Sequence, residues 1–250
     1  MRAIRQHAFG GPDELRLEDV PDPRPGSGQV RIRVESAGVH VIDTAIRRGQ
    51  QTGVFALPEL PMTPGREVAG MIDELGDGVD PGWLGRRVVA HLGMASGGYA
   101  ELAVAAVDAL HEIPGSLDAH GAVAMIGTGR TMMAILEVAE PTAADVVLIT
   151  AAAGGIGSLL VQAARNAGAT AVGVAGGAKK AALAGELGAT VAFDYTQPGW
   201  TGAVRDALDG REITLAFDGV GGDIGGAFEL LGIGGRLILY GWSSGTPLTV

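Results

Sequence analysis

A glycine-rich turn is the part of this 250-residue sequence whose residue types and spacing point most directly to chemistry. The apolar run Val146–Thr150 predicts a strand buried on both faces, and Gly154-Gly155-Ile156-Gly157 follows it at the start of a helical pattern. A strand, a glycine turn and a helix in this order bind the pyrophosphate of a dinucleotide. Gly154 lets the backbone approach the phosphates, Gly157 lets the helix pack closely, and the helix N-terminus holds the negative charge. Ala152 replaces the first glycine of this fingerprint, so a merely structural turn is the alternative.

The end of the second expected strand indicates which dinucleotide is bound. Sites for NAD place Asp or Glu about 20 residues past the glycines, where the carboxylate bonds the ribose 2′-hydroxyl. Here the stretch from Val174 to Lys180 holds no carboxylate and ends in Lys179 and Lys180. Because a lysine attracts a 2′-phosphate, these residues favour NADPH; the alternative is that they only form the solvated start of a helix.

The elements that must position this turn alternate between strands and helices from about residue 121 onward. Continuous apolar runs predict strands, and the segments between them have helical periodicity. The expected strands are 146–150, 171–174, 191–193, 214–217 and 236–240, and the expected helices after the first are 179–187, 201–208 and 223–231. This order predicts a parallel, right-handed, doubly wound sheet.

The first 120 residues have a different pattern, with short alternating stretches separated by turn residues. The expected strands are 15–20, 30–35, 68–75, 87–91 and 99–104. The pattern predicts antiparallel, barrel-like β structure. We therefore expect two domains, 1–120 and 121–250.

Composition excludes several classes of function. The chain has 28 acidic and 18 basic residues, a formal charge of −10, and no clustered basic face, which argues against nucleic-acid binding. It has no cysteine, so disulfides, Cys-ligated zinc and iron–sulfur clusters are excluded. No stretch approaches the ~20 apolar residues of a membrane span, and Gly10, Gly11 and Pro12 interrupt any export signal. We expect a soluble, cytoplasmic protein without a membrane partner.

Short sequence motifs distributed over nearly the whole chain resemble those of a known family. They are Met1–Ile4 with Gly11-Pro12, Gly38–Thr44 with Ile46–Gly49, Pro64–Gly70, Gly97–Glu101, and Ala151–Gly157 with Gln162-Ala163-Ala164. Together they resemble the zinc-independent quinone oxidoreductases of the medium-chain dehydrogenase/reductase superfamily, which include ζ-crystallin. The resemblance implies a GroES-like β-barrel domain, 1–120, followed by a Rossmann NADPH-binding domain, 121–250. It also implies hydride transfer from NADPH to a quinone or an α,β-unsaturated carbonyl, a small-molecule substrate.

The same resemblance assigns cofactor contacts residue by residue. Lys180 and Tyr195 look like the pair that clamps the 2′-phosphate, and Thr131 with the loops at Val220 and Tyr240 looks like the nicotinamide and ribose side. The complete expected cofactor set is Thr131, Gly154, Gly155, Ile156, Gly157, Gly176, Lys180, Tyr195, Val220, Tyr240, Gly241 and Ser243.

Zinc-dependent relatives supply catalytic ligands at three places, and the resemblance aligns His40, Arg66 and Gly127 with them. Arginine offers no lone pair, and its fixed positive charge repels Zn²⁺. The cysteine-lined structural zinc loop is absent as well. We expect no metal.

His40 and Asp43 are the candidate catalytic residues. The resemblance places His40 near the nicotinamide, where the family usually has asparagine, and a histidine there suits protonation of an enolate after hydride transfer. A satisfied hydrogen-bonding histidine is the alternative. Asp43 is a candidate orienter of His40 or of substrate, with loop capping as its alternative, and Ala45 replaces a tyrosine that some relatives carry.

Family members continue beyond residue 250 with a sixth strand and a return into the first domain, so we expect that the sequence is incomplete. In relatives the last strand builds the dimer interface, which predicts a homodimer if that segment is present. Two other functions remain open: an enoyl reductase acting on acyl thioesters, and a non-catalytic NADPH-binding sensor or structural protein.

Overall fold

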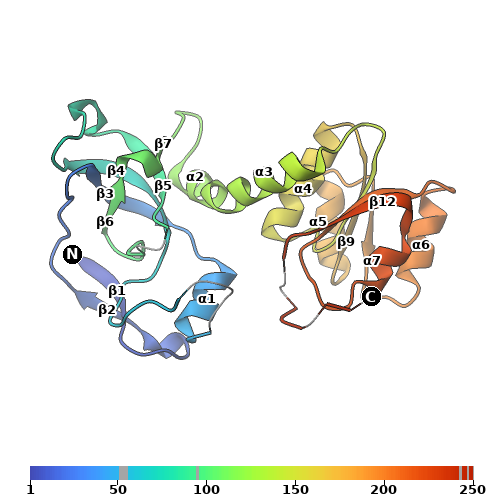
Figure 1. The fold of residues 1–250 in the computed structure, drawn as a ribbon, viewed down its shortest axis with the longest axis horizontal. Coiled ribbons are helices and arrows are strands. Elements are labelled where there is room, and N and C mark those ends of the chain that lie inside the picture. The colour runs from blue at the N-terminus through green and yellow to red at the C-terminus, as the bar shows by residue number, and fades with distance from the viewer. Residues whose placement is uncertain (51–55, 94–95, 242–243, 247, 250) are drawn as a thin grey trace. The chain divides into compact units, whose positions relative to one another are not determined.

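The computed structural model describes residues 1–250 except 51–55, 94–95, 242–243, 247 and 250. The chain divides into two compact units, Met1–Gly127 and Thr128–Val250. Strands predominate in the first unit, and helices and strands alternate in the second (Figure 1). The sequence placed the domain boundary near residue 120, whereas helix α2 (Ala119–Ile126) packs on the sheet of the first unit.

The first unit is built on an antiparallel sheet of strand order β6-β3-β4-β5-β7. A separate two-stranded ribbon pairs β1 with β2, and the short helix α1 follows β3. The bounds are β1 Arg2–Gln6, β2 Leu15–Asp19, β3 Gln29–Ala37, α1 Val41–Arg47, β4 Glu67–Leu75, β5 Arg87–His91, β6 Leu102–Ala106 and β7 Leu110–Glu112.

Period-two alternation determines which face of these strands is buried. In β3, Val30 and Ile32 are completely buried while Arg31 and Arg33 point to the other face. Val30 and Ile32 join Val68, Ile72 and other apolar side chains of β4, β5 and β6 in one core. The predicted stretches 30–35, 68–75 and 87–91 are strands of this sheet, and 15–20 is β2 of the separate ribbon. Strand β6 begins at Leu102 and leaves Tyr99, where the sequence predicted a strand, in a loop.

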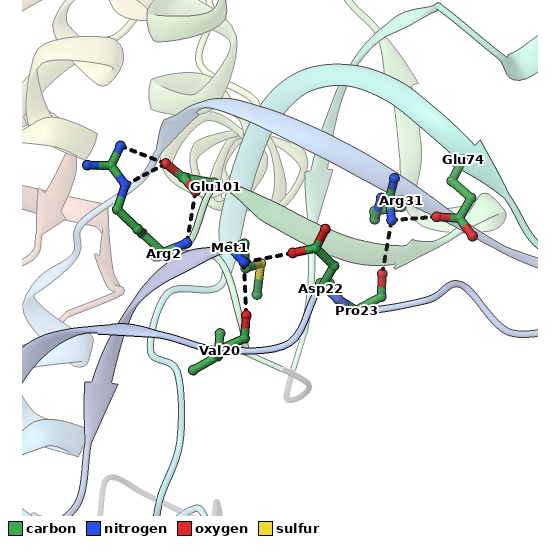
Figure 2. Close-up of polar contacts among 8 residues, drawn as sticks. All are labelled: Met1, Arg2, Val20, Asp22, Pro23, Arg31, Glu74 and Glu101. Atoms are coloured by element: carbon green, nitrogen blue, oxygen red, sulfur yellow. Dashed lines mark hydrogen bonds and ion pairs between the residues drawn. The ribbon is translucent and has the colours of Figure 1, made fainter.

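Polar contacts hold the N-terminal ribbon in place (Figure 2). The Met1 ammonium donates to the Val20 carbonyl at 2.9 Å and to Asp22 Oδ1 at 2.7 Å, and this contact lowers the pKa of Asp22. Arg2 pairs with Glu101, donating through its backbone N–H and its guanidinium, each at 2.8 Å. These contacts position β1 next to Tyr99, whose carbonyl accepts the Ile4 N–H at 2.8 Å.

Arg31 provides the second group of contacts in Figure 2. Its guanidinium reaches the Pro23 carbonyl at 3.5 Å and the Glu74 carboxylate at 2.5 Å, as Figure 2 shows. Its Nε also donates to Asp73 Oδ1 at 2.8 Å. Bonding to Asp73 is the main cause of the raised pKa of Arg31. The proline-rich stretch after β2 is thereby tied to β3 and β4.

The second unit contains a parallel sheet of strand order β10-β9-β8-β11-β12. Its bounds are α3 Thr128–Ala139, β8 Val146–Ile149, α4 Gly155–Asn166, β9 Thr170–Ala175, α5 Ala178–Glu186, β10 Val191–Asp194, α6 Trp200–Ala207, β11 Ile213–Asp218, α7 Gly225–Glu229 and β12 Leu231–Leu239. All four residues of β8 are buried, because apolar clusters cover both faces of the sheet. The predicted doubly wound α/β fold is confirmed.

Some local predictions differ from the structure. Helices α1, α2 and α3 were not predicted, although the buried residues Met132, Ile135 and Ala139 of α3 follow helical spacing. Helix α7 is shorter than predicted, and β12 begins at Leu231 instead of residue 236. A register shift between Ile213 and Leu215 lets β12 pair with β11 across its glycine-rich beginning, which sequence periodicity does not reveal.

Within the described residues, no single helix is long and apolar enough to cross a membrane. Only α2 and α3 taken together, which are bent at Gly127, reach that length and composition.

Candidate functional site

The glycine turn lies at the carboxyl end of β8, where it begins helix α4. Gly154 is the N-cap residue, with φ −81° and ψ 173°, and no side chain among the described residues caps this helix. The first N–H groups of a helix have no partner inside it, so those of Gly155, Ile156 and Gly157 are available to a ligand. Gly154 and Gly155 are exposed. The turn therefore offers an uncapped, accessible set of donors of the kind that binds phosphate.

Gly157 is the glycine that the packing requires. A Cβ there would overlap the carbonyl oxygen of Ala151 and lie 3.0 Å from Ala152 Cα. Ala151 itself has a φ of +46°, a strained value for a residue with a side chain. Ala152, which replaces the first glycine of the fingerprint, is completely buried, and its N–H donates to the Val174 carbonyl at 3.1 Å. The fingerprint thus tolerates alanine at 152, where the side chain enters the core.

A second loop meets the turn at the point where the strand order reverses. From β8 the chain continues to β9 and β10 on one side of the sheet, and from the neighbouring strand β11 it continues to β12 on the other side. Dinucleotides bind at such a switch point. Asp218 ends β11 and is buried, and its carboxylate accepts the Thr150 hydroxyl at 2.9 Å. It also accepts the N–H groups of Val220 at 3.0 Å and Gly221 at 2.7 Å. Sequence reasoning missed Thr150 and Asp218, although a polar residue ending an apolar strand was a usable signal.

The candidate 2′-phosphate residues lie at the carboxyl ends of β9 and β10. Tyr195 donates its backbone N–H to the Ala175 carbonyl at 3.2 Å, and its ring packs on Gly176, where a Cβ would lie 2.9 Å from the hydroxyl. Lys179 and Lys180 are exposed in the first turn of α5. The structure thus brings Gly176 and Tyr195 together and leaves the lysine ammonium groups facing solvent.

One carboxylate near this position, that of Asp194, was not among the residues predicted from the sequence. Asp194, the last residue of β10, accepts the Thr196 hydroxyl at 2.7 Å, the Gly177 N–H at 2.8 Å and the Thr196 N–H at 3.0 Å. These bonds, the Thr196 hydroxyl foremost, lower the pKa of Asp194 to about 2. The carboxylate is ionised at neutral pH and holds the beginning of α5 in place.

The remaining cofactor candidates lie around the end of β12 and on α3. Tyr240 donates its N–H to the Asp218 carbonyl at 2.9 Å, and its ring packs on Gly219. Burial, followed by the charge of Asp218, raises the pKa of Tyr240 to about 12. Gly241 packs on the Gly219 backbone. Thr131 is exposed on α3, and Ser243 lies outside the described residues.

In the first unit, three of the motifs that carried the family resemblance converge. The segment at Gly97–Tyr99 pairs with the segment at Thr63–Gly65 through three backbone hydrogen bonds of 2.9 Å. The Tyr99 ring packs on Gly65, whose φ of +92° and lack of a side chain make this contact possible. From there the Tyr99 hydroxyl donates to Asp43 Oδ2 at 3.1 Å.

His40 and Glu67 form the first polar pair of this cluster. Nε2 of His40 is hydrogen-bonded to Oε2 of Glu67, a carboxylate that is buried at the start of β4. His91 Nε2 lies 3.9 Å from the other oxygen of Glu67. Gly38 and Gly127 pack directly on the Glu67 carboxylate, so neither position leaves room for a side chain. Glu67 and His91 are residues that sequence reasoning missed, because neither lies in a recognisable catalytic spacing.

Asp43 and Arg66 form the second pair. Asp43 Oδ2 accepts the backbone N–H of His40 at 2.8 Å, so Asp43 holds the beginning of α1 and not the imidazole ring. Arg66 Nε lies 4.0 Å from Asp43 Oδ1. Burial, followed by the charge of Asp43, raises the pKa of the Tyr99 phenol. The cluster therefore combines two carboxylates, a guanidinium, the two imidazoles of His40 and His91, and a neutral phenol.

The aligned ligand positions of zinc-dependent relatives, His40, Arg66 and Gly127, all lie next to Asp43 or Glu67. Arg66 contributes a cation without a lone pair, and Gly127 contributes no side chain. The described ranges contain no group of three or more His, Cys, Asp or Glu side chains that could hold a metal ion. These residues do not fit a catalytic zinc.

Comparison with known proteins identifies two family models. The model for the alcohol dehydrogenase GroES-like domain matches residues 26–115, and the model described as zinc-binding dehydrogenase matches residues 155–250.

Individual relatives extend over most of the chain. The rat quinone oxidoreductase is 34% identical over 244 residues, which cover 96% of this chain and 73% of that protein. A 2-haloacrylate reductase of a Burkholderia species is 32% identical over 96% of this chain and 72% of its own length. The structure of Escherichia coli quinone oxidoreductase complexed with NADPH superposes with a TM-score of 0.88 at 28% identity, covering 100% of this chain and 76% of that one.

Substituting Gly157 by alanine tests the packing of the glycine turn. Because the new Cβ overlaps the Ala151 carbonyl, we expect Gly157→Ala to lower the free energy of unfolding by about 1–3 kcal/mol and to weaken dinucleotide binding. Urea denaturation and a fluorescence titration with dinucleotide measure the two effects. Gly185→Ala in α5 is the matched control, since no described atom lies within 4 Å of its Cβ position. Equal behaviour of the two variants would contradict the role assigned to Gly157.

Proposed function

Because the chain belongs to the quinone oxidoreductase family of the medium-chain dehydrogenase/reductase superfamily, and is thus an NADPH-dependent oxidoreductase, we propose that it reduces quinones or α,β-unsaturated carbonyl compounds without zinc. The observation that carries this proposal is the polar cluster of the first unit. Arg66 takes a position where zinc-dependent relatives have a metal ligand, and its charge faces Asp43. The substrate is a small molecule.

The second unit supports the choice of cofactor. The uncapped start of α4 offers N–H donors for the pyrophosphate, and Asp218 holds Val220 in the facing loop at the switch point. Asp194, at the carboxyl end of β10, is bonded to Gly177 and Thr196. Lys180 remains to attract a 2′-phosphate, which supports NADPH over NADH.

NADPH supplies the hydride, so the protein needs only to position the acceptor and stabilise the charge that develops. Hydrogen-bond donors aimed at the acceptor oxygen lower the barrier, because they bind the transition state more strongly than the ground state. The first unit has donors of this kind in Arg66 and His40.

His40 is the proposed proton donor. Its Nε2 is bonded to Glu67, which fixes the orientation of the ring. Asp43 supports the same loop through the backbone N–H of His40 and the Tyr99 hydroxyl. We therefore propose His40 as a catalytic residue and Asp43 and Glu67 as positioning residues.

The assay that tests the function mixes purified protein with NADPH or NADH and follows cofactor oxidation. The acceptors are 1,4-benzoquinone, a medium-chain 2-enal and a 2-enoyl thioester. We expect turnover that prefers NADPH and one of the first two acceptors. Turnover of the thioester alone would identify an enoyl reductase instead, and NADPH binding without turnover of any acceptor would identify a sensor.

Lys180→Ala tests the 2′-phosphate contact. Losing a hydrogen bond to a charged group costs roughly 1.5–3 kcal/mol, so we expect NADPH to bind about tenfold to a hundredfold more weakly. Affinity for NADH, which lacks that phosphate, stays unchanged. Arg16→Ala, which removes an exposed basic side chain from β2 of the first unit, is the control. Equal losses for NADPH and NADH would contradict the assignment.

His40→Asn tests the proton donor and introduces the residue usual in the family. Asparagine cannot give a proton to the α-carbon, so we expect the variant to lose about 100-fold in kcat for the enal. His111→Asn, exposed in β7, is the control. An unchanged kcat in His40→Asn would exclude a catalytic role.

A further inference from the structure

Arg66 carries an unused hydrogen-bonding capacity inside the polar cluster. In the described part of the chain its Nε is buried and has no hydrogen-bond partner. The nearest carboxylate oxygen, Asp43 Oδ1, lies 4.0 Å away, which is beyond hydrogen-bonding distance. About a fifth of the Arg66 side chain is exposed, so part of it is open to a ligand.

The two neighbouring carboxylates, Asp43 and Glu67, form hydrogen bonds to other residues. Asp43 Oδ2 accepts the His40 N–H and the Tyr99 hydroxyl, and Glu67 is bonded to the ring of His40. Arg66 is instead fixed by its backbone, whose carbonyl accepts the Leu92 N–H at 2.6 Å. Among the described residues, the chain therefore holds the backbone of Arg66 in place and leaves its Nε donor without a partner. Because leaving a buried donor unpaired is unfavourable, an arginine of this kind indicates a bound oxygen atom.

We propose that Arg66 donates to the carbonyl oxygen of the acceptor and stabilises the enolate that forms there, an inference that rests on the proposed function. In an enone, hydride adds with its electron pair to the β-carbon, the C=C pair moves between the α-carbon and the carbonyl carbon, and the C=O pair moves onto oxygen. The enolate oxygen then carries the charge that the guanidinium holds. Protonation at the α-carbon completes the reduction, and NADPH is oxidised to NADP⁺.

The charges of the cluster favour a neutral carbonyl over a carboxylate as the ligand. Arg66 is one cation among the carboxylates of Asp43 and Glu67, with His40, His91 and the neutral phenol of Tyr99 as the other titratable groups. A carboxylate ligand would bring a third negative charge to this group. A carbonyl oxygen brings negative charge only as the transition state forms, when stabilisation by a fixed cation accelerates the reaction.

The test compares wild type with Arg66→Ala, Arg66→Lys and the exposed control Arg33→Met. For the acceptor that wild type reduces best, we expect Arg66→Ala to lose about 10²- to 10³-fold in kcat. Affinity for NADPH and the melting temperature should stay close to wild type. Added guanidinium ion, tested at concentrations below those that unfold the protein, should restore part of the kcat of Arg66→Ala and leave Arg33→Met unchanged. Arg66→Lys should lie between wild type and Arg66→Ala.

Each result that contradicts the proposal points to a different cause. Wild-type turnover is measured first, and its absence contradicts the proposed function together with this inference. Wild-type turnover that Arg66→Ala retains contradicts only the role of Arg66. A combined loss of melting temperature, NADPH affinity and kcat without rescue by guanidinium shows a structural arginine. A selective rise of KM for 2-chloroacrylate, a carboxylate-bearing acceptor, shows a carboxylate site.

Discussion

Each unit buries a carboxylate, and a carboxylate that leaves water must be surrounded by donors. In the second unit Asp218 is 3% exposed and accepts the Thr150 hydroxyl and two backbone N–H groups. The loop after β11 therefore closes over the end of β8, beside the glycine turn. In the first unit Glu67 is equally buried and is paired with His40. Both candidate sites are built around the need to satisfy these two side chains.

Close approach of backbone and ring is the second shared feature. Gly157 lets α4 pack on Ala151, Gly65 receives the ring of Tyr99, and Gly219 receives the ring of Tyr240. At each of these positions a side chain would block the contact, so the absence of one lets the two segments pack closely. The high glycine content, 42 of 250 residues, includes these contacts as well as ordinary turns. It is a property of the packing and not of disorder.

The two units divide the chemistry between them. The second offers an uncapped helix N-terminus and two lysines, which suit phosphate groups. The first combines Arg66, His40 and Tyr99 with two carboxylates, which suits an acceptor whose oxygen becomes negative. Under the proposed function the cofactor supplies the redox chemistry, so the residues of the first unit only position and polarise the acceptor.

The sequence by itself determined the parallel α/β sheet, most strands of the antiparallel sheet, and the glycine turn. These depend on periodicity and on the order of neighbouring residues, which are local properties. It did not reveal α1, α2 or α3, although the buried residues Met132, Ile135 and Ala139 of α3 follow helical spacing. The candidate residues His40, Asp43 and Lys180 also came from the sequence, whereas Glu67, His91, Asp194, Asp218 and the donors left on Arg66 did not. Only the tertiary structure decided those pairings, because hydrogen bonds between residues such as Thr150 and Asp218 join segments 68 residues apart.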